Sequence, residues 1–254
     1  MATALVATGA VLAVVASAAS ASLIYNNQPK PLPKNLASIG FEATSTSEFG
    51  GQVEFAGTAR ISPTVQVTMS SWACQNLEGG ANCKSEAKSS FEWPITLNVY
   101  AVGAEDEPGA LITSSTKTFA IPYRPSANKK CAANEEGVVG YGPECFHGKA
   151  FKITFPLEGV TLPGKAIVSV AYNTSHHGYA PTGGPNLGQD SLNLALTEPS
   201  EGALTVGADP LPEDVYVNST WSGMYGSKGT VGQFTLTNEW EGLQPTYKIR
   251  AKSH

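Results

Sequence analysis

Apolar and polar residues alternate with a period of two over much of this 254-residue chain. In residues 64–72, Val65, Val67 and Met69 fall on one side and polar residues fall on the other. The same alternation occurs in residues 94–102, 165–173, 191–196 and 245–251. Because successive side chains of a strand point to opposite faces, this pattern predicts strands with one buried face and one wet face.

Six further segments have the composition of strands: residues 38–43, 51–55, 111–121, 150–156, 215–218 and 230–236. Turn residues separate them, notably Glu107-Pro108-Gly109, Leu162-Pro163-Gly164 and Gly183-Gly184-Pro185. Helical periodicity of 3.6 residues is missing outside the N-terminal apolar segment. About eleven short antiparallel strands therefore predict an all-β fold, either a sandwich or a barrel.

Residues 1–22 have the character of a secretory signal peptide. The segment holds no charged residue, and its apolar core is followed by two small-residue steps of the A-x-A type, at residues 16–18 and 19–21. We expect the mature chain to begin near residues 19–23 and the protein to be secreted. A short membrane anchor is the alternative, although the apolar run is shorter than the roughly 20 residues that a span needs. A second apolar run is absent, so we expect no membrane span in the mature chain.

Four cysteines agree with export. Cys74 and Cys83 are nine residues apart, and Cys131 and Cys145 are fourteen apart. An even count in an exported protein predicts disulfides, and we favour Cys74–Cys83 and Cys131–Cys145 among the three pairings. A zinc site does not fit, because no C-x-x-C occurs.

Residues 23–36 contain several prolines and predict an extended lead-in before the folded domain. The polar stretch 197–214 could be a linker to a separate C-terminal unit. Only about 40 residues follow it, and so short a segment without cysteine rarely folds alone. We therefore predict one β-sandwich domain over residues 37–254.

The formal net charge of −5 and the absence of a basic run exclude a typical nucleic-acid binder, so we expect no nucleic-acid partner. Sequence motifs for nucleophilic or zinc-dependent hydrolysis, G-x-S-x-G and H-E-x-x-H, are also missing. Glu239 and Glu241, which flank Trp240, would share one face of a strand as a glycosidase pair does. A charged solvent face beside a buried tryptophan explains them more simply, and we assign no catalytic residue.

The longest Gly- and Pro-rich segment, residues 174–190, follows a predicted strand and is the first candidate ligand site. Long loops at the end of a sandwich are common binding sites. Polar and aromatic groups of this kind suit sugar rings, whose hydroxyls need polar partners and whose C–H faces pack on aromatic rings. The candidate ligand-binding residues here are Asn173, His176, His177, Tyr179 and Asp190.

Trp221 and Tyr225 form a second candidate, an aromatic platform in a Gly- and Ser-rich segment with little local core. For both candidates the alternative is that the aromatic and polar residues pack within their own loops and bind no ligand. Asp190, Asn173 and loop carbonyls could instead hold a structural calcium ion, a hard cation that prefers oxygen ligands. We expect no other metal and no organic cofactor.

Several stretches resemble a family of uncharacterised secreted bacterial β-sandwich proteins. They include IGFEATSTSEFGGQVEFAGTAR, VTMSSWACQ, WPITLNVYAVG, TFAIPYRPSA and VSVAYNTSHHGY. The order of strand, P-x-T-L-x-V-Y and Pro-Gly-x-Leu is also similar to extracellular jelly-roll modules. The resemblance covers most of residues 25–196. It implies a jelly-roll-like sandwich outside the cell, and it carries no catalytic residues.

The sequence therefore favours a secreted, non-catalytic β-sandwich that binds an extracellular glycan or a cell-surface component through loops at one end. A structural or adhesion module without a small-molecule site is the first alternative. A secreted glycan hydrolase is the second.

Overall fold

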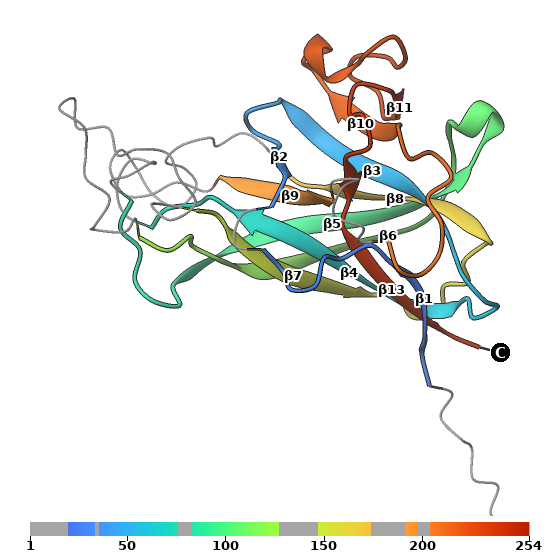
Figure 1. Ribbon diagram of the computed structural model, residues 1–254, viewed down its shortest axis with the longest axis horizontal. Helices are drawn as coiled ribbons and strands as arrows, with labels where there is room; N and C mark the ends of the chain where they lie inside the picture. The colour runs from blue at the N-terminus through green and yellow to red at the C-terminus, as the bar shows by residue number, and fades with distance from the viewer. Residues whose placement is uncertain are drawn as a thin grey trace, which may run out of the picture.

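The computed structural model describes residues 20–33, 36–75, 83–126, 147–173, 191–197 and 204–253. They form an all-β fold of thirteen strands in two sheets, in which every strand pair is antiparallel (Figure 1). Residues 1–19, which hold most of the predicted signal peptide, lie outside the described residues.

The first sheet has seven strands. Its order is β1-β13-β4-β9-β12, while β2 pairs with β9 and β7 pairs with β4. The strands are β1 (Ser22–Asn26), β2 (Ser38–Gly40), β4 (Ile61–Ser71), β7 (Lys149–Pro156), β9 (Leu192–Thr197), β12 (Gln244–Pro245) and β13 (Tyr247–Lys252).

The second sheet has six strands in the order β11-β10-β3-β8-β5-β6. They are β3 (Thr46–Glu54), β5 (Ser90–Val102), β6 (Pro108–Pro122), β8 (Lys165–Ala171), β10 (Val215–Ser219) and β11 (Thr235–Thr237). Two single-turn 3-10 helices, η2 (Ala104–Asp106) and η4 (Ser222–Met224), lie in connections.

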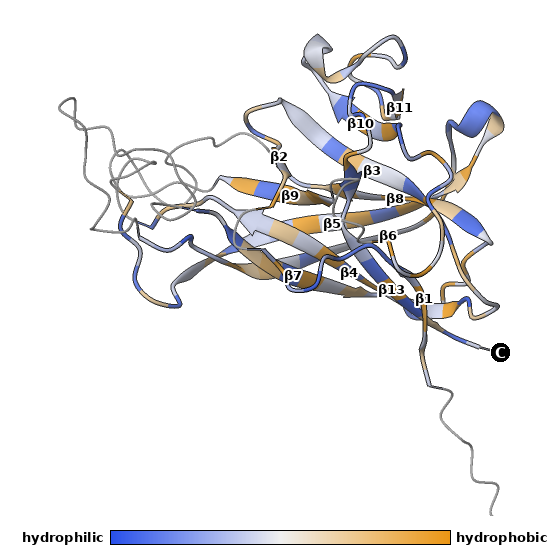
Figure 2. Cartoon of the chain, viewed as in Figure 1, coloured by the Kyte–Doolittle hydropathy of each residue, from blue (hydrophilic) through white to orange (hydrophobic). Residues whose placement is uncertain are grey.

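One hydrophobic core lies between the sheets. The alternating residues Val65, Val67 and Met69 of β4 are almost fully buried in it, together with Leu97 and Val99 of β5. The alternation of hydrophobic and hydrophilic residues along the strands is visible in Figure 2. Burial of the apolar side of each strand supplies the main driving force for this arrangement.

A smaller apolar cluster lies apart from this core. It is built on Ile167, Tyr216 and Leu236, with Tyr100 and Phe234 packed against it. These residues come from β5, β8, β10 and β11 of the six-stranded sheet and from Phe234, which directly precedes β11. The C-terminal part of the chain thus contributes strands to both sheets, since β10 and β11 join one sheet and β12 and β13 join the other.

Each of the eleven segments expected to form strands overlaps an observed strand, and β1 and β12 are additional. The segment expected over residues 230–236 overlaps only at its end, because residues 230–234 lie outside any strand and β11 spans Thr235–Thr237. The start of the extended lead-in expected over residues 23–36 belongs to β1, which pairs with β13 from Ser22 to Asn26. After β1 ends, the side chain of Asn27 bonds to the backbone at the start of β13 and at the residue Pro245 of β12. Its Oδ1 accepts the Tyr247 N–H at 2.6 Å, and its Nδ2 donates to Pro245 O at 2.9 Å.

The turn expected at residues 107–109 lies slightly earlier. The chain reverses at Ala104–Asp106, and Pro108 and Gly109 already belong to β6. A hydrogen bond from Gly103 N to Glu107 O, at 2.8 Å, closes this turn. The backbone is tight there, since a Cβ on Gly103 would lie 2.8 Å from that carbonyl.

The predicted Cys74–Cys83 disulfide is confirmed, with a Cα–Cα distance of 5.7 Å. Both cysteines are buried. Cys131 and Cys145 lie outside the described residues.

Candidate functional site

The chain segments that flank residues 76–82, 127–146 and 174–190 lie together at one end of the sandwich, which we call the loop end (Figure 1). Hydrogen bonds join these flanks directly. They run from Trp72 N to Ser191 O (2.8 Å), from Arg124 N to Ala73 O (2.9 Å) and from Ser85 N to Ser126 Oγ (3.0 Å). These hydrogen bonds hold the residues that flank the three connections close to one another.

Only one residue of the first predicted ligand site falls within the described part of the chain. Asn173 follows β8 at the loop end and is exposed. The other predicted residues, His176, His177, Tyr179 and Asp190, lie outside the described residues. Tyr172, next to Asn173, points into the core, where its ring stacks on Phe41 at 4.1 Å.

A cavity of about 400 Å³ lies at the loop end beside the disulfide. Its volume falls within the range of small-ligand sites. Its walls come from the segment after Cys83, the end of β6 and the start of β7. The lining residues are Ser85, Glu86, Ala87, Lys88, Ser89, Pro122, Tyr123, Arg124, Pro125, Ser126, His147 and Lys149.

The cavity combines hydroxyl, aromatic and cationic groups. Arg124 is 1% exposed, and burial lowers its pKa to about 10, so it remains a cation at neutral pH. Lys88 and Lys149 are exposed at the same cavity. The Tyr123 ring lies 5.1 Å from the ring of Phe91, which holds it in place.

A half-buried carboxyl group, that of Glu42, also belongs to the loop end. Burial raises its pKa to about 7, and hydrogen bonds from backbone N–H groups only partly oppose this effect. Its Oε2 is buried and has no hydrogen-bond partner in the described part of the chain. The nearby Tyr172 hydroxyl donates instead to Leu192 O at 2.8 Å. Glu42 therefore titrates close to physiological pH.

The second predicted site separates into two different environments. Trp221 is 52% exposed, so its indole is available to solvent. Tyr225 is partly buried, and its hydroxyl accepts the Ser219 N–H at 3.0 Å and lies 3.1 Å from Gln233 O. The Tyr225 hydroxyl thus serves to hold its own segment together.

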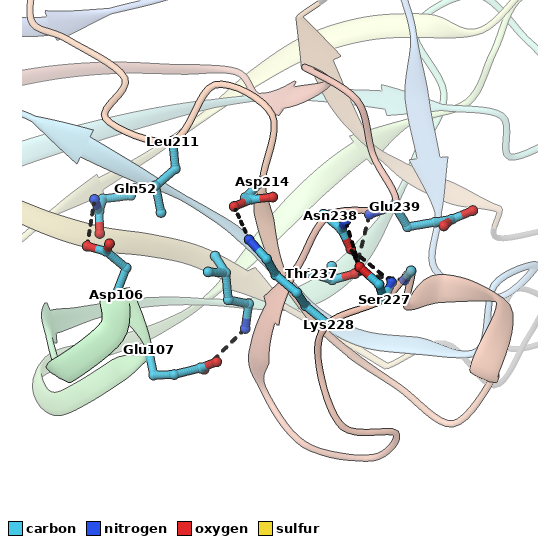
Figure 3. A network of polar contacts seen from close by, with 12 residues as sticks. Gln52, Asp106, Glu107, Leu211, Asp214, Ser227, Lys228, Thr237, Asn238 and Glu239 are labelled. Atoms are coloured by element: carbon cyan, nitrogen blue, oxygen red, sulfur yellow. Dashed lines mark hydrogen bonds and ion pairs between the residues drawn. The ribbon is translucent and has the colours of Figure 1, made fainter.

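A polar network fastens the same segment to the six-stranded sheet (Figure 3). Lys228 Nζ lies 3.0 Å from Asp214 Oδ2, and Ser227 N donates to Asn238 Oδ1 at 3.0 Å. Glu107 Oε2 accepts the Leu236 N–H at 3.2 Å. The exposed Trp221 is therefore carried on a connection that is bonded at several points.

A carboxylate on the outer face of the six-stranded sheet is held by three side-chain donors. Glu48 Oε1 accepts Asn98 Nδ2 at 2.8 Å, Tyr100 OH at 3.0 Å and Ser169 Oγ at 2.5 Å. Asn98 is oriented in turn by Ser114 Oγ, which donates to its Oδ1 at 2.7 Å. The hydrogen bonds described for this carboxylate all reach Oε1, so the network joins β3, β5, β6 and β8 around one oxygen.

A second hollow, of about 520 Å³, opens near Glu54, Arg60 and Lys165. Arg60, a cation in the wall of this hollow, is engaged in hydrogen bonds to the backbone. The Arg60 guanidinium donates to the carbonyls of Phe55, Ala59 and Pro163 at 2.7–3.0 Å. This arrangement is typical of a structural arginine.

Glu239 and Glu241 do not lie on a strand, contrary to the geometry considered for a glycosidase pair. They occupy a turn before β12, and Glu241 has a φ of 30°. Trp240 between them is partly buried and packs edge-on against Phe49, with ring centroids 5.1 Å apart. Because a turn does not alternate as a strand does, the strand spacing considered for a glycosidase pair does not apply to these two residues.

Within the described ranges, no group of three or more His, Cys, Asp or Glu residues is placed to hold a metal ion. Asp190, proposed with Asn173 as a calcium ligand, is outside those ranges. A search of the same residues finds no helix with the length and apolar character needed to cross a membrane.

Comparison of the chain with protein-family models, with curated proteins and with solved structures found no match.

Sequence reasoning missed the cavity residues Arg124, His147 and Lys149, and also Glu42 and Glu48. Arg124 and His147 lie close to the two ends of the long connection 127–146. This position is the sequence feature that could have marked them as candidate site residues. Glu42 and Glu48 gave no comparable indication, because their partners lie far away in the sequence; Ser169, for example, is 121 residues from Glu48.

Proposed function

We propose that this protein is a secreted, non-catalytic β-sandwich protein that binds an extracellular glycan, or another cell-surface component, at its loop end. The observation that carries the proposal is the cavity of about 400 Å³ beside the Cys74–Cys83 disulfide. Strands, disulfide and backbone hydrogen bonds position its walls, so a ligand would meet a largely preformed site.

The lining joins hydrogen-bonding groups to a larger apolar surface, and a sugar presents both hydroxyls and C–H faces. Ser89 Oγ and Ser126 Oγ donate to the carbonyls of Glu86 and Ser85, so these hydroxyls offer acceptor positions to a ligand. Lys149, at the same cavity, brings a donor. The ring of Tyr123 supplies an aromatic surface for the C–H face of a sugar. Hydrogen-bonding groups beside an apolar and aromatic wall match a sugar, which has hydroxyls as well as C–H faces.

The proposal is tested by screening the full mature chain on a glycan array and by pull-down with insoluble polysaccharides. We expect retention on at least one glycan, with that glycan chemically unchanged after prolonged incubation. Lys149→Ala and His147→Ala should each weaken retention several-fold, because both residues line the cavity.

Lys117→Ala is the matched control. Lys117 is exposed on β6 and lies outside the cavity lining, so its loss should leave retention unchanged. Failure to retain any glycan, with the fold intact, would refute the proposal and favour a structural or adhesion module. Shortening of the bound glycan would favour a glycan hydrolase instead.

The proposal includes two finer structural features: a jelly-roll-like strand topology and a second disulfide between Cys131 and Cys145. Antiparallel sheets and the confirmed Cys74–Cys83 bridge support them. Peptide mapping by mass spectrometry without reduction tests the second disulfide, and a Cys131- or Cys145-containing peptide recovered with a free thiol would contradict it.

A further inference from the structure

The two sheets differ sharply in charge. The seven strands of the first sheet contain no Asp or Glu, although the whole chain has a formal net charge of −5. Every charged residue in those strands is a cation. They are Lys149, Lys152, Lys248, Arg250 and Lys252.

Four of these cations point away from the core. On β13, Tyr247, Ile249 and Ala251 are buried, so the alternate positions 248, 250 and 252 face outward. On β7, the exposed Lys152 precedes the buried Ile153.

The register places the cations of β7 and β13 on one surface. Lys248 is opposite Gln66, and Lys152 is opposite Thr68, so both flank β4 from the same face. Alternate residues of a strand are about 7 Å apart, and strands separated by one neighbour are about 10 Å apart. Lys152, Lys248, Arg250 and Lys252 thus form an array that we call the cationic face.

No carboxylate neutralises the cationic face within the described residues. The ion pairs found there, Lys165–Asp106 and Lys228–Asp214, lie elsewhere. Partial burial lowers the pKa of Lys152, and repulsion by Lys248 lowers it further. Neighbouring like charges on a sheet are destabilising, so the face carries an electrostatic cost that an anionic partner would relieve.

The chemistry of the face narrows the class of partner. The large exposed apolar residues of the described chain are Leu111, Leu204, Trp221 and Val231, and none belongs to this sheet. The face therefore offers nothing to insert into a lipid bilayer. It also presents no outward aromatic ring from β4, β7 or β13 on which a nucleic-acid base could stack.

Hydroxyl and amide groups lie among the cations. Thr64 and Gln66 of β4, and Thr154 of β7, share the outward side, and all three are partly exposed. A polymer with both acidic groups and hydroxyls would find partners for each. We propose that the cationic face is a second binding surface, separate from the loop-end cavity, for a linear polysaccharide that carries carboxylate or sulfate groups.

The test is retention of the full mature chain on immobilised dextran sulfate and on polygalacturonate, with uncharged dextran as the matched control. We expect retention on the anionic polymers but not on dextran, and we expect added salt to weaken it. The double variant Lys248→Gln/Arg250→Gln should lower affinity on the order of tenfold, and Lys152→Gln alone should lower it less.

Lys117→Gln and Lys165→Gln, on the six-stranded sheet, should bind as the wild type does. A urea unfolding curve for each variant separates loss of binding from loss of fold, and Lys152→Gln keeps the test available if the double variant is unstable. Equal retention of the wild type and all face variants, or no retention on either anionic polymer, would overturn the inference. Binding only to anionic vesicles or to DNA would also overturn it.

Lys149→Ala and His147→Ala, which test the loop-end cavity, lie outside the cationic face. The two proposals can therefore fail independently.

Discussion

Glu42 shows how a single residue at the loop end responds to its surroundings. Its carboxyl group is held partly out of water, and burial raises its pKa to about 7. The folded state therefore holds a proton at a pH where the unfolded chain has already lost it. Below about pH 4.5 both states are protonated, so the contribution to stability changes between about pH 4.5 and pH 7.

We predict that the free energy of unfolding falls as pH rises through this window, because the native state binds more protons than the unfolded state. Asp209 contributes in the same direction, since burial raises its pKa to about 6. Glu42→Gln should reduce the pH slope measured by urea unfolding between pH 5 and pH 7, and Asp209→Asn should remove a further part. An unchanged slope in Glu42→Gln would contradict the assignment.

Glu48 differs from Glu42, whose buried Oε2 has no hydrogen-bond partner in the described part of the chain. Three side chains donate hydrogen bonds to Glu48 Oε1. Glu48→Gln replaces a charged acceptor with a neutral amide, which weakens three hydrogen bonds to one oxygen. We predict a loss of about 2 kcal/mol in the free energy of unfolding, measured with urea. Glu54→Gln is the matched control on the same strand, since Glu54 is exposed, and it should change stability little. Equal effects of the two variants would show that the network contributes nothing.

At the scale of the elements, β1 and the residue after it are held more firmly than the proline-rich sequence suggests. Asn27 is 3% exposed and bonds to both Tyr247 and Pro245. In effect, the side chain of Asn27 continues the pairing of β1 with β13.

We predict that Asn27→Ala lowers the free energy of unfolding by about 2 kcal/mol, because the buried Tyr247 N–H loses its partner. Asn26→Ala is the control, since the Asn26 side chain bonds to Thr205 in an exposed position. Differential scanning calorimetry should show a clearly lower melting temperature only for Asn27→Ala. Comparable shifts for both variants would mean that β1 is not held through Asn27.

The period-two pattern predicted the strands well because alternation is a local property. Val65, Val67 and Met69 report the buried side of β4 whichever strands pair with it. The pattern did not predict β1 or β12, because β1 is followed at once by prolines and β12 spans only Gln244–Pro245. Strand order escaped prediction altogether, since the pairing of β1 with β13 joins the two ends of the chain.

The site was harder to predict than the fold for the same reason. The loop-end cavity is assembled from Ser85, Tyr123 and Lys149, which are far apart in sequence and meet only after the sheets form. Which side chains would line the resulting space depends on the register of β4 with β7 and β9, which local sequence does not contain.

At the scale of the whole molecule, the structure separates two kinds of surface. One end carries the cavity between the flanks of long connections, and the charged residues on the strands of the seven-stranded sheet are all cations. A rigid sandwich holds both surfaces in fixed positions, so ligand binding at either would require little rearrangement of the strands.

The central claim, that the loop-end cavity binds a glycan without altering it, is tested most directly by NMR titration. The isotope-labelled protein would be titrated with a soluble oligosaccharide of the glycan retained on the array. We predict saturable shifts in the amides of the non-proline residues within 85–89, 122–126 and 147–149, with the oligosaccharide spectrum showing no new reducing end. Shifts confined to residues outside these three ranges, or cleavage of the oligosaccharide, would contradict it.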